Sequence, residues 1–175
     1  MIEEINKCVN VLQNGGLIVY PTDTVWGIGC DATNPEAVQK VYALKKREVS
    51  KPLVCLVANQ AMLERQVKEV PDVAYDIMDF ATKPTTIVFD QPLGVADNLV
   101  AADNTLGIRV ASDKFCQYLI NKFRKPIVST SANISGKITP KQFKDIDEEI
   151  LKGVDYVVNL QNENYTPSPS SIIKL

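Results

Sequence analysis

Four cationic side chains stand within one short stretch of a chain whose net charge is only −2: Lys45, Lys46, Arg47 and Lys51. Glu48 is the one acidic residue among them. A cluster of this kind on a structured turn is well suited to bind polyanionic phosphate, because Arg offers a planar fork of donors and Lys a point charge. The alternative is a solvated basic turn with no ligand.

The spacing of Lys45 and Arg47 sets a condition on that phosphate site. On a continuous helix, residues two apart point about 200° away from each other and cannot share a ligand. They converge only if the helix ends between them, and Val49, Ser50 and Pro52 favour such an end. We therefore expect a helix that begins at the Asn34-Pro35 capping pair and ends near Lys45 or Lys46.

Two further segments offer groups for a small polar ligand. Residues 129–136, Ser-Thr-Ser-Ala-Asn-Ile-Ser-Gly, follow an apolar strand, and strand ends are where open α/β sheets bind ligands. Residues 20–29 combine two threonines, an aspartate, an aromatic residue and two glycines. Hydroxyls there could contact a substrate and glycine could allow close backbone approach, although an ordinary Thr/Asp-rich turn is the alternative.

Arg109 lies near the end of an apolar, β-branched run and could bind a carboxylate from a strand. An unpaired arginine on a strand is as often a plain surface residue.

The elements that must position these residues follow from periodicity and capping signals. Helices are expected at residues 2–14, 35–46, 60–68, 72–81, 113–123 and 139–151. Strands are expected at residues 17–20, 52–57, 85–89, 106–110, 126–130, 156–160 and 171–175. Residues 21–29 are expected to form a loop and 161–169 a mobile flap. This order predicts an α/β fold with a twisted mixed parallel/antiparallel sheet and flanking helices, in a single domain over 1–175.

Composition excludes several classes of chemistry. Histidine is absent, which removes Ser-His-Asp and Cys-His catalysis and His-based metal sites, whereas phosphate transfer by positioning and charge stabilisation remains open. The four cysteines are scattered and are expected to be buried and free. The net charge argues against bulk attraction to nucleic acid or membrane, and no signal segment is recognisable, so we expect a cytoplasmic protein.

Five motifs resemble one family in order and spacing: YPTDTVWGIGCDA, K-x-R-x-x-x-K-P-L, LGIRV, PIVSTSANISGK and PSSII. Together they resemble the single-domain, YrdC-like threonylcarbamoyl-AMP synthases of the TsaC type. The resemblance implies a basic concave face on the sheet. It also implies synthesis of threonylcarbamoyl-AMP and pyrophosphate from L-threonine, bicarbonate and ATP, for the t6A37 modification of tRNA. ATP would be used together with Mg²⁺, and no protein side chain is expected as a metal ligand.

The resemblance also assigns roles to residues. The catalytic set comprises Lys45, Arg47, Ser131 and Asn133. The ATP-binding set comprises Arg47, Lys51, Thr105, Ser131 and Thr139. The threonine-binding set comprises Thr24, Arg109, Ser129 and Ser170. Binding of RNA or tRNA on the basic face, and contacts with other t6A-pathway proteins, stay open.

The chain departs from the family pattern at Glu48, Lys83 and Ala111. These departures leave room for a weakly active paralogue. Two rival functions also stay open, namely an RNA-binding YrdC-like module and a carbamoyl-transfer enzyme.

Overall fold

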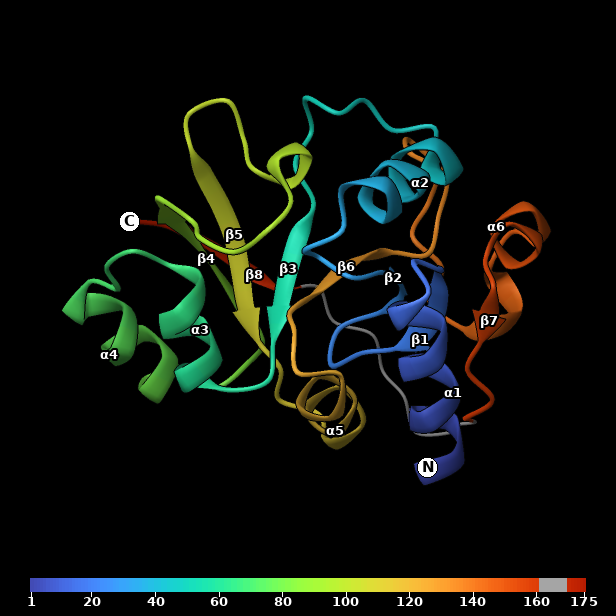
Figure 1. Ribbon diagram of the computed structural model, residues 1–175, viewed down its shortest axis with the longest axis horizontal. Coiled ribbons are helices and arrows are strands. Elements are labelled where there is room, and N and C mark those ends of the chain that lie inside the picture. The colour runs from blue at the N-terminus through green and yellow to red at the C-terminus, as the bar shows by residue number, and fades with distance from the viewer. Residues whose placement is uncertain (161–169) are drawn as a thin grey trace.

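The strands of the computed structural model, which describes residues 1–160 and 170–175, form one mixed sheet (Figure 1). In order along the chain they are β1 (Ile18–Pro21), β2 (Trp26–Gly29), β3 (Val54–Val57), β4 (Thr85–Asp90), β5 (Thr105–Val110), β6 (Ile127–Ser131), β7 (Tyr156–Val157) and β8 (Ser171–Lys174). Their order across the sheet is β7-β1-β2-β6-β3-β5-β4-β8. The pairs β1/β7, β3/β5 and β4/β8 are parallel and the others antiparallel, so the predicted mixed α/β sheet is confirmed.

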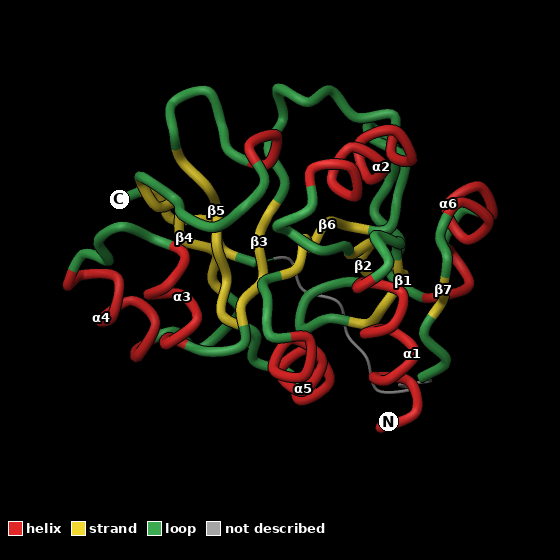
Figure 2. The backbone as a smooth tube through the Cα atoms, in the orientation of Figure 1, coloured by secondary structure: helices red, strands yellow, loops and turns green. Residues whose placement is uncertain are grey.

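Helices flank the sheet on several sides (Figures 1 and 2). They are α1 (Ile2–Gln13), α2 (Pro35–Lys45), α3 (Gln60–Gln66), α4 (Asp72–Phe80), α5 (Lys114–Phe123) and α6 (Glu148–Gly153), with short 3₁₀ turns η1 (Asp97–Leu99) and η2 (Phe143–Asp145). Helices α1 and α5 pack side by side, α3 lies on β3 and β5, and α2 contacts η1 and α6. Among the helices of residues 1–160 and 170–175, none combines the length and apolar character that crossing a bilayer requires.

The capping signals in the sequence correctly locate the starts of two helices. The Asn34 side chain accepts hydrogen bonds from the backbone N–H groups of Glu36 and Ala37, and Asp113 accepts one from Cys116. Both caps satisfy donors that have no partner inside the helix. The expected helices at 60–68 and 72–81 are also present, each shorter at its C-terminal end by one or two residues.

The core is one apolar cluster of residues between Ile5 and Val158. All four cysteines are buried and free, as predicted. The prediction of one domain over 1–175 stays a prediction. The expected flap at 161–169 lies outside the described residues.

Two expected elements are wrong. Residues 26–29 are not loop but strand β2, where the buried ring of Tyr20 packs so close that a Cβ on Gly29 would stand 2.6 Å from it. Glycine has low strand propensity, so a sequence pattern does not predict this strand, although the strand requires glycine at position 29 for the close contact with Tyr20.

The expected helix at 139–151 is also wrong, because the chain forms only η2 and the short α6. The N-cap is Asp147, whose side chain accepts a hydrogen bond from the Glu149 N–H, and the helix cannot begin earlier than that cap.

Candidate active site

A chain of hydrogen bonds joins three of the expected catalytic residues. Lys45 is the last residue of α2 and is 1% exposed; its Nζ donates to the Ser131 carbonyl oxygen at 2.6 Å and lies 3.5 Å from Ser131 Oγ. Ser131 Oγ in turn donates to Asn133 Oδ1. The Asn133 amide donates to the carbonyl oxygens of Ile134 and Lys137, at 3.1 and 3.0 Å, which fixes its orientation. The end of β6 and the end of α2 therefore meet through polar side chains.

The buried ammonium group of Lys45 has a perturbed titration. No carboxylate of the described residues forms an ion pair with it. Burial, and then the nearby charge of Arg47, lower the pKa of Lys45 from 10.5 to about 7. Desolvation disfavours the charged form of an amine, and a neighbouring cation does so further. An anion that enters beside Lys45 would offset both effects by its opposite charge and favour the ammonium form.

The cationic cluster separates as the helix ends. Lys46 adopts a left-handed conformation (φ 52°) at the C-cap of α2, which confirms the predicted end of the helix between the two flanking cations. Its Nζ pairs with Glu149 of α6 at 3.2 Å. Arg47 instead donates from Nε to the Lys51 carbonyl at 3.0 Å and from Nη2 to the Pro52 carbonyl at 3.1 Å. The guanidinium is thus held against the 51–52 turn, and Lys51 is exposed.

Arg109, next to the C-terminal end of β5, forms a second polar centre. Its side chain is almost fully buried, and its Nη2 lies 3.1 Å from Asp23 Oδ1. Asp23 Oδ2 accepts hydrogen bonds from Ser112 N at 3.1 Å and from Ser112 Oγ at 2.7 Å. Neither Nε nor Nη2 of Arg109 makes a hydrogen bond within the described chain. A buried guanidinium with unused donors is suited to bind a carboxylate.

Hydroxyl groups line the surroundings of this centre. Thr86 of β4 stands directly opposite Arg109 in the sheet, and its Oγ1 lies 2.9 Å from Ser170 Oγ. Ser170 is therefore brought next to the Arg109 centre from a distant part of the chain. Thr24 is buried in the turn after β1, with its Oγ1 3.0 Å from Thr22 Oγ1.

Ser129 is buried two residues before Ser131 on β6, on the same face of that strand. It lies between the Lys45 chain and the half of the sheet that carries Arg109, opposite Val54 of β3.

The remaining expected ATP contacts, Thr105 and Thr139, do not touch the hydrogen-bonded residues Lys45, Ser131 and Asn133. Thr105 lies four residues before Arg109 at the start of β5, and its Oγ1 donates to Asp103 Oδ1 at 2.6 Å. The parallel register of β3 and β5 places this end of β5 beside the segment that holds Arg47. Thr139 is exposed in the loop before η2. Thr105 and Thr139 therefore lie apart from the expected catalytic set of Lys45, Arg47, Ser131 and Asn133.

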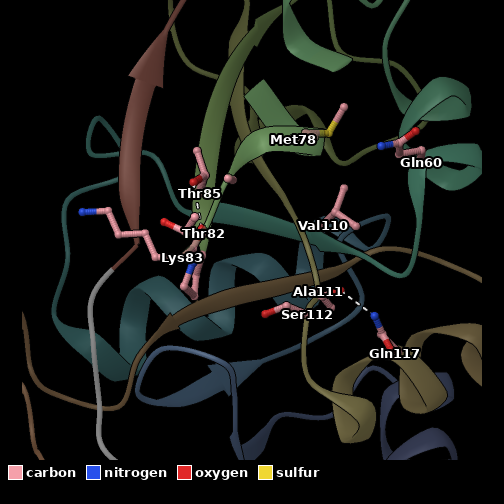
Figure 3. Close-up of a pocket in the computed structure, with 11 residues that line it drawn as sticks. Gln60, Met78, Thr82, Lys83, Thr85, Val110, Ala111, Ser112 and Gln117 are labelled. Atoms are coloured by element: carbon pink, nitrogen blue, oxygen red, sulfur yellow. Dashed lines mark hydrogen bonds between the residues drawn. The ribbon is translucent and has the colours of Figure 1, made fainter. Parts of the chain in front are cut away.

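A hollow of about 440 Å³ lies where β4 begins and β5 ends (Figure 3), and its strand residues Thr85 and Val110 face the side of the sheet opposite to Arg109. It is lined in part by Lys83 and Ala111, two of the three departures from the family pattern. Figure 3 shows Ser112 next to Ala111, whose carbonyl accepts a hydrogen bond from the Gln117 amide at 2.9 Å. Lys83 and Ala111 therefore share one hollow, whereas the third departure, Glu48, directly follows Arg47.

Sequence reasoning does not find two residues of the second centre. Asp23 is part of the Y-P-T-D-T motif, in which only the threonine hydroxyls were expected to contact a substrate. Thr86 is the fully buried polar residue of an apolar strand, and a strand pattern alone does not distinguish it from a packing residue.

A family model named for Sua5, YciO and YrdC, and described as "Telomere recombination", matches residues 10–175. A putative threonylcarbamoyl-AMP synthase of Methanocaldococcus jannaschii is 38% identical over 178 residues, which cover 99% of this chain and 83% of the relative.

Solved structures extend the likeness to the fold. The crystal structure of P. abyssi Sua5 complexed with L-threonine aligns with a TM-score of 0.87 and 26% identity, over 98% of this chain and 50% of that chain. This chain therefore spans about half the length of that Sua5. The E. coli YciO structure aligns with a TM-score of 0.83 and 24% identity, over 98% of this chain and 83% of that chain, which shows the shared fold. The chain belongs to the Sua5/YciO/YrdC family.

Proposed function

We propose that the protein is an L-threonylcarbamoyladenylate synthase, a nucleotidyltransferase that converts L-threonine, bicarbonate and ATP into threonylcarbamoyl-AMP and pyrophosphate. The observation that carries the proposal is the pair of polar centres on one sheet: the Lys45–Ser131–Asn133 chain beside Arg47, and the buried Arg109 with two unused donors. The first suits phosphate and the second a carboxylate. The name of the Methanocaldococcus relative and the threonine-bound Sua5 structure support this assignment.

In the proposed reaction, Arg109 binds the threonine carboxylate, and Thr24, Ser129 and Ser170 surround the amino acid. Bicarbonate releases CO₂ and hydroxide, and the hydroxide takes one proton from the threonine ammonium group to give water. The free amine attacks CO₂ to form the N–C bond of a carbamate and loses its second proton to solvent. A carbamate oxygen then attacks the α-phosphorus of ATP, and the bond to the pyrophosphate oxygen breaks. The free amine and the carbamate oxygen, once positioned, are nucleophilic enough for these steps to proceed without a histidine base.

Arg47, Lys51 and Lys45 would stabilise the charge of the triphosphate, with Ser131 and Asn133 beside the reacting phosphate and Thr105 and Thr139 as further ATP contacts. Across residues 1–160 and 170–175, no group of three or more His, Cys, Asp or Glu side chains could hold a metal ion. Mg²⁺ fits the site through the substrate, because it binds substrate phosphates and keeps several waters and so needs no cluster of protein carboxylates. Bound there, Mg²⁺ would neutralise phosphate charge.

The proposed product serves t6A37 modification of tRNA, which places the protein in the cytoplasm with the other proteins of that pathway. The expected basic concave face, and RNA bound to it, belong to the same proposal. Any attraction of RNA to that face would be local, because the chain carries a net charge of −2.

The test is a pyrophosphate-release assay with the purified chain, ATP and bicarbonate, run with and without L-threonine. We expect pyrophosphate and an AMP-containing product only when all three substrates are present. L-Serine should be a poorer substrate by about 10- to 200-fold, the effect of one missing methyl contact in a pocket.

Equal pyrophosphate release without an amino acid would refute the proposal. Release that requires carbamoyl phosphate in place of threonine would favour the carbamoyl-transfer alternative. Salt-dependent RNA binding without nucleotide turnover would favour the binding module, and threonine-dependent but very slow turnover would favour the weak paralogue.

A further inference from the structure

The ion pair between Asp23 and Arg109 joins parts of the sheet that are not neighbours. Asp23 lies in the turn between β1 and β2, whereas Arg109 belongs to β5, and strands β6 and β3 stand between β2 and β5 in the sheet. Both side chains are only 5% exposed. A charge pair removed from water costs free energy unless its geometry compensates, so a buried pair across this distance in the fold needs an explanation beyond stability.

The orientation of the Asp23 carboxylate is fixed from one side. Its Oδ2 accepts two hydrogen bonds from Ser112, one from the backbone N–H and one from the hydroxyl. Its Oδ1 has no hydrogen bond and lies 3.1 Å from Arg109 Nη2. Ser112 therefore sets the direction in which the free carboxylate oxygen faces the guanidinium.

The unused donors of Arg109 lie on one edge of its guanidinium. Nε and Nη2 point to the same side of the planar group, which is the edge that binds a carboxylate through two parallel hydrogen bonds. Nη2 carries two N–H groups, so it can face Asp23 and still serve an incoming carboxylate. Both donors are buried and make no hydrogen bond within the described residues, and the charge of the guanidinium is balanced by Asp23 before a substrate carboxylate binds.

We propose that Asp23, held by Ser112, is a positioning residue that fixes the guanidinium of Arg109 for capture of the substrate carboxylate. This inference rests on the proposed function, because it takes L-threonine as the ligand of Arg109. Asp23 touches neither the reacting atoms nor the nucleotide in this scheme. It acts through Arg109 alone, so its loss impairs amino-acid capture and leaves the phosphate centre at Lys45 intact.

The decisive variant is Asp23→Asn, which keeps the shape of the side chain and the acceptor for Ser112 but removes the charge that faces Arg109. We expect the KM for L-threonine to rise about 10- to 100-fold, the order of loss that a small misplacement of a binding group causes. The KM for ATP should stay within about twofold of the wild-type value, because the substitution weakens only the binding of the amino acid.

A double-mutant cycle separates positioning from a general structural role. In an Arg109→Lys background the fork is already lost, so Asp23→Asn should add little further increase in the threonine KM. Fully additive effects of the two changes would show that Asp23 does not act through Arg109 and would overturn the inference.

A further variant keeps the test decisive if Asp23→Asn folds poorly. Ser112→Ala removes one of the two donors to Asp23 and should raise the threonine KM about three- to tenfold, the effect of one hydrogen bond. An unchanged threonine KM in Ser112→Ala would then count against the inference.

Asp31→Asn is the matched control. Asp31 is also buried, accepts two hydrogen bonds from Thr33 and pairs with Lys125, but it lies away from Arg109. It should lose stability without a change in the threonine KM.

Failure of the proposed function and failure of the positioning role give different results. A wild-type protein that makes no threonine-dependent pyrophosphate refutes the proposed function. An active wild type whose threonine KM is the same in Asp23→Asn refutes only the positioning role.

Discussion

The replacement Lys45→Met tests whether the ammonium group at the end of α2 is truly desolvated. Methionine has a similar length and carries no charge. The folded protein lowers the pKa of Lys45 to about 7, whereas the unfolded chain keeps the ordinary value of 10.5. Between these values the unfolded state binds more protons, so stability rises with pH. Below pH 7 both states are protonated, and the full cost of the buried charge remains.

The size of the effect follows from the two pKa values. Each pH unit between them is worth about 1.4 kcal/mol, so the whole range corresponds to about 5 kcal/mol of destabilisation that the charged form causes. Between pH 6 and pH 9 the Lys45 titration alone should raise the free energy of unfolding by about 3 kcal/mol. Lys45→Met lacks this titration. Its advantage over the wild type should therefore be larger at pH 6 than at pH 9 by that amount.

The assay is urea unfolding of both proteins at pH 6, 7, 8 and 9. The difference between the two proteins is the useful quantity, because burial also raises the pKa values of all four cysteines. Those thiols lower stability as the pH rises, but equally in both proteins. Lys46→Met is the control, since Lys46 is exposed and pairs with Glu149. A wild-type-minus-Lys45→Met difference that does not change with pH would refute the reasoning.

Three more variants test other parts of the structure. Arg47→Ala should raise the KM for ATP at least tenfold, because it removes a charged hydrogen-bond donor worth about 1.5–3 kcal/mol from the phosphate centre. The control Lys46→Ala should change the KM for ATP by less than twofold. Equal losses for the two variants in steady-state kinetics would mean that the cluster acts only as diffuse charge. Arg109→Ala should raise the threonine KM about 10- to 150-fold and the ATP KM much less, in the same assay. Gly29→Ala should lower the free energy of urea unfolding by about 1–3 kcal/mol, because its Cβ would overlap the Tyr20 ring; full stability would show that the ring can move.

Local signals in the sequence were enough to locate α2 and to place Lys45 at its C-terminal end. Asn34 and Pro35 mark its start, and the need for Lys45 and Arg47 to converge required its end between them. The means of that end could not be foreseen, since Lys46 turns the chain through a left-handed conformation that few non-glycine residues adopt. The hydrogen bond from Lys45 to the Ser131 carbonyl likewise depends on how α2 packs against β6.

The second polar centre was less accessible to sequence reasoning. Arg109 was a candidate from its place on a strand and Ser170 came from the family resemblance, but the roles of Asp23 and Thr86 become visible only when β1, β4 and β5 are brought together. Strand β2 was missed for a related reason, because its glycines serve a contact with Tyr20 and not a turn. Pairings between residues far apart in sequence leave little trace in local periodicity.

Strand β8 pairs with β4, although residues 91–170 separate the two strands in sequence. During synthesis at about 5–20 residues per second, the outer edge of β4 has no partner for several seconds until residues 171–174 emerge. An unpaired strand edge can bind other chains, so this interval is the time when the nascent protein is most exposed to aggregation. The residue just before this late strand is Ser170, so its contact with Thr86 next to Arg109 forms only after the last residues of β8 are available.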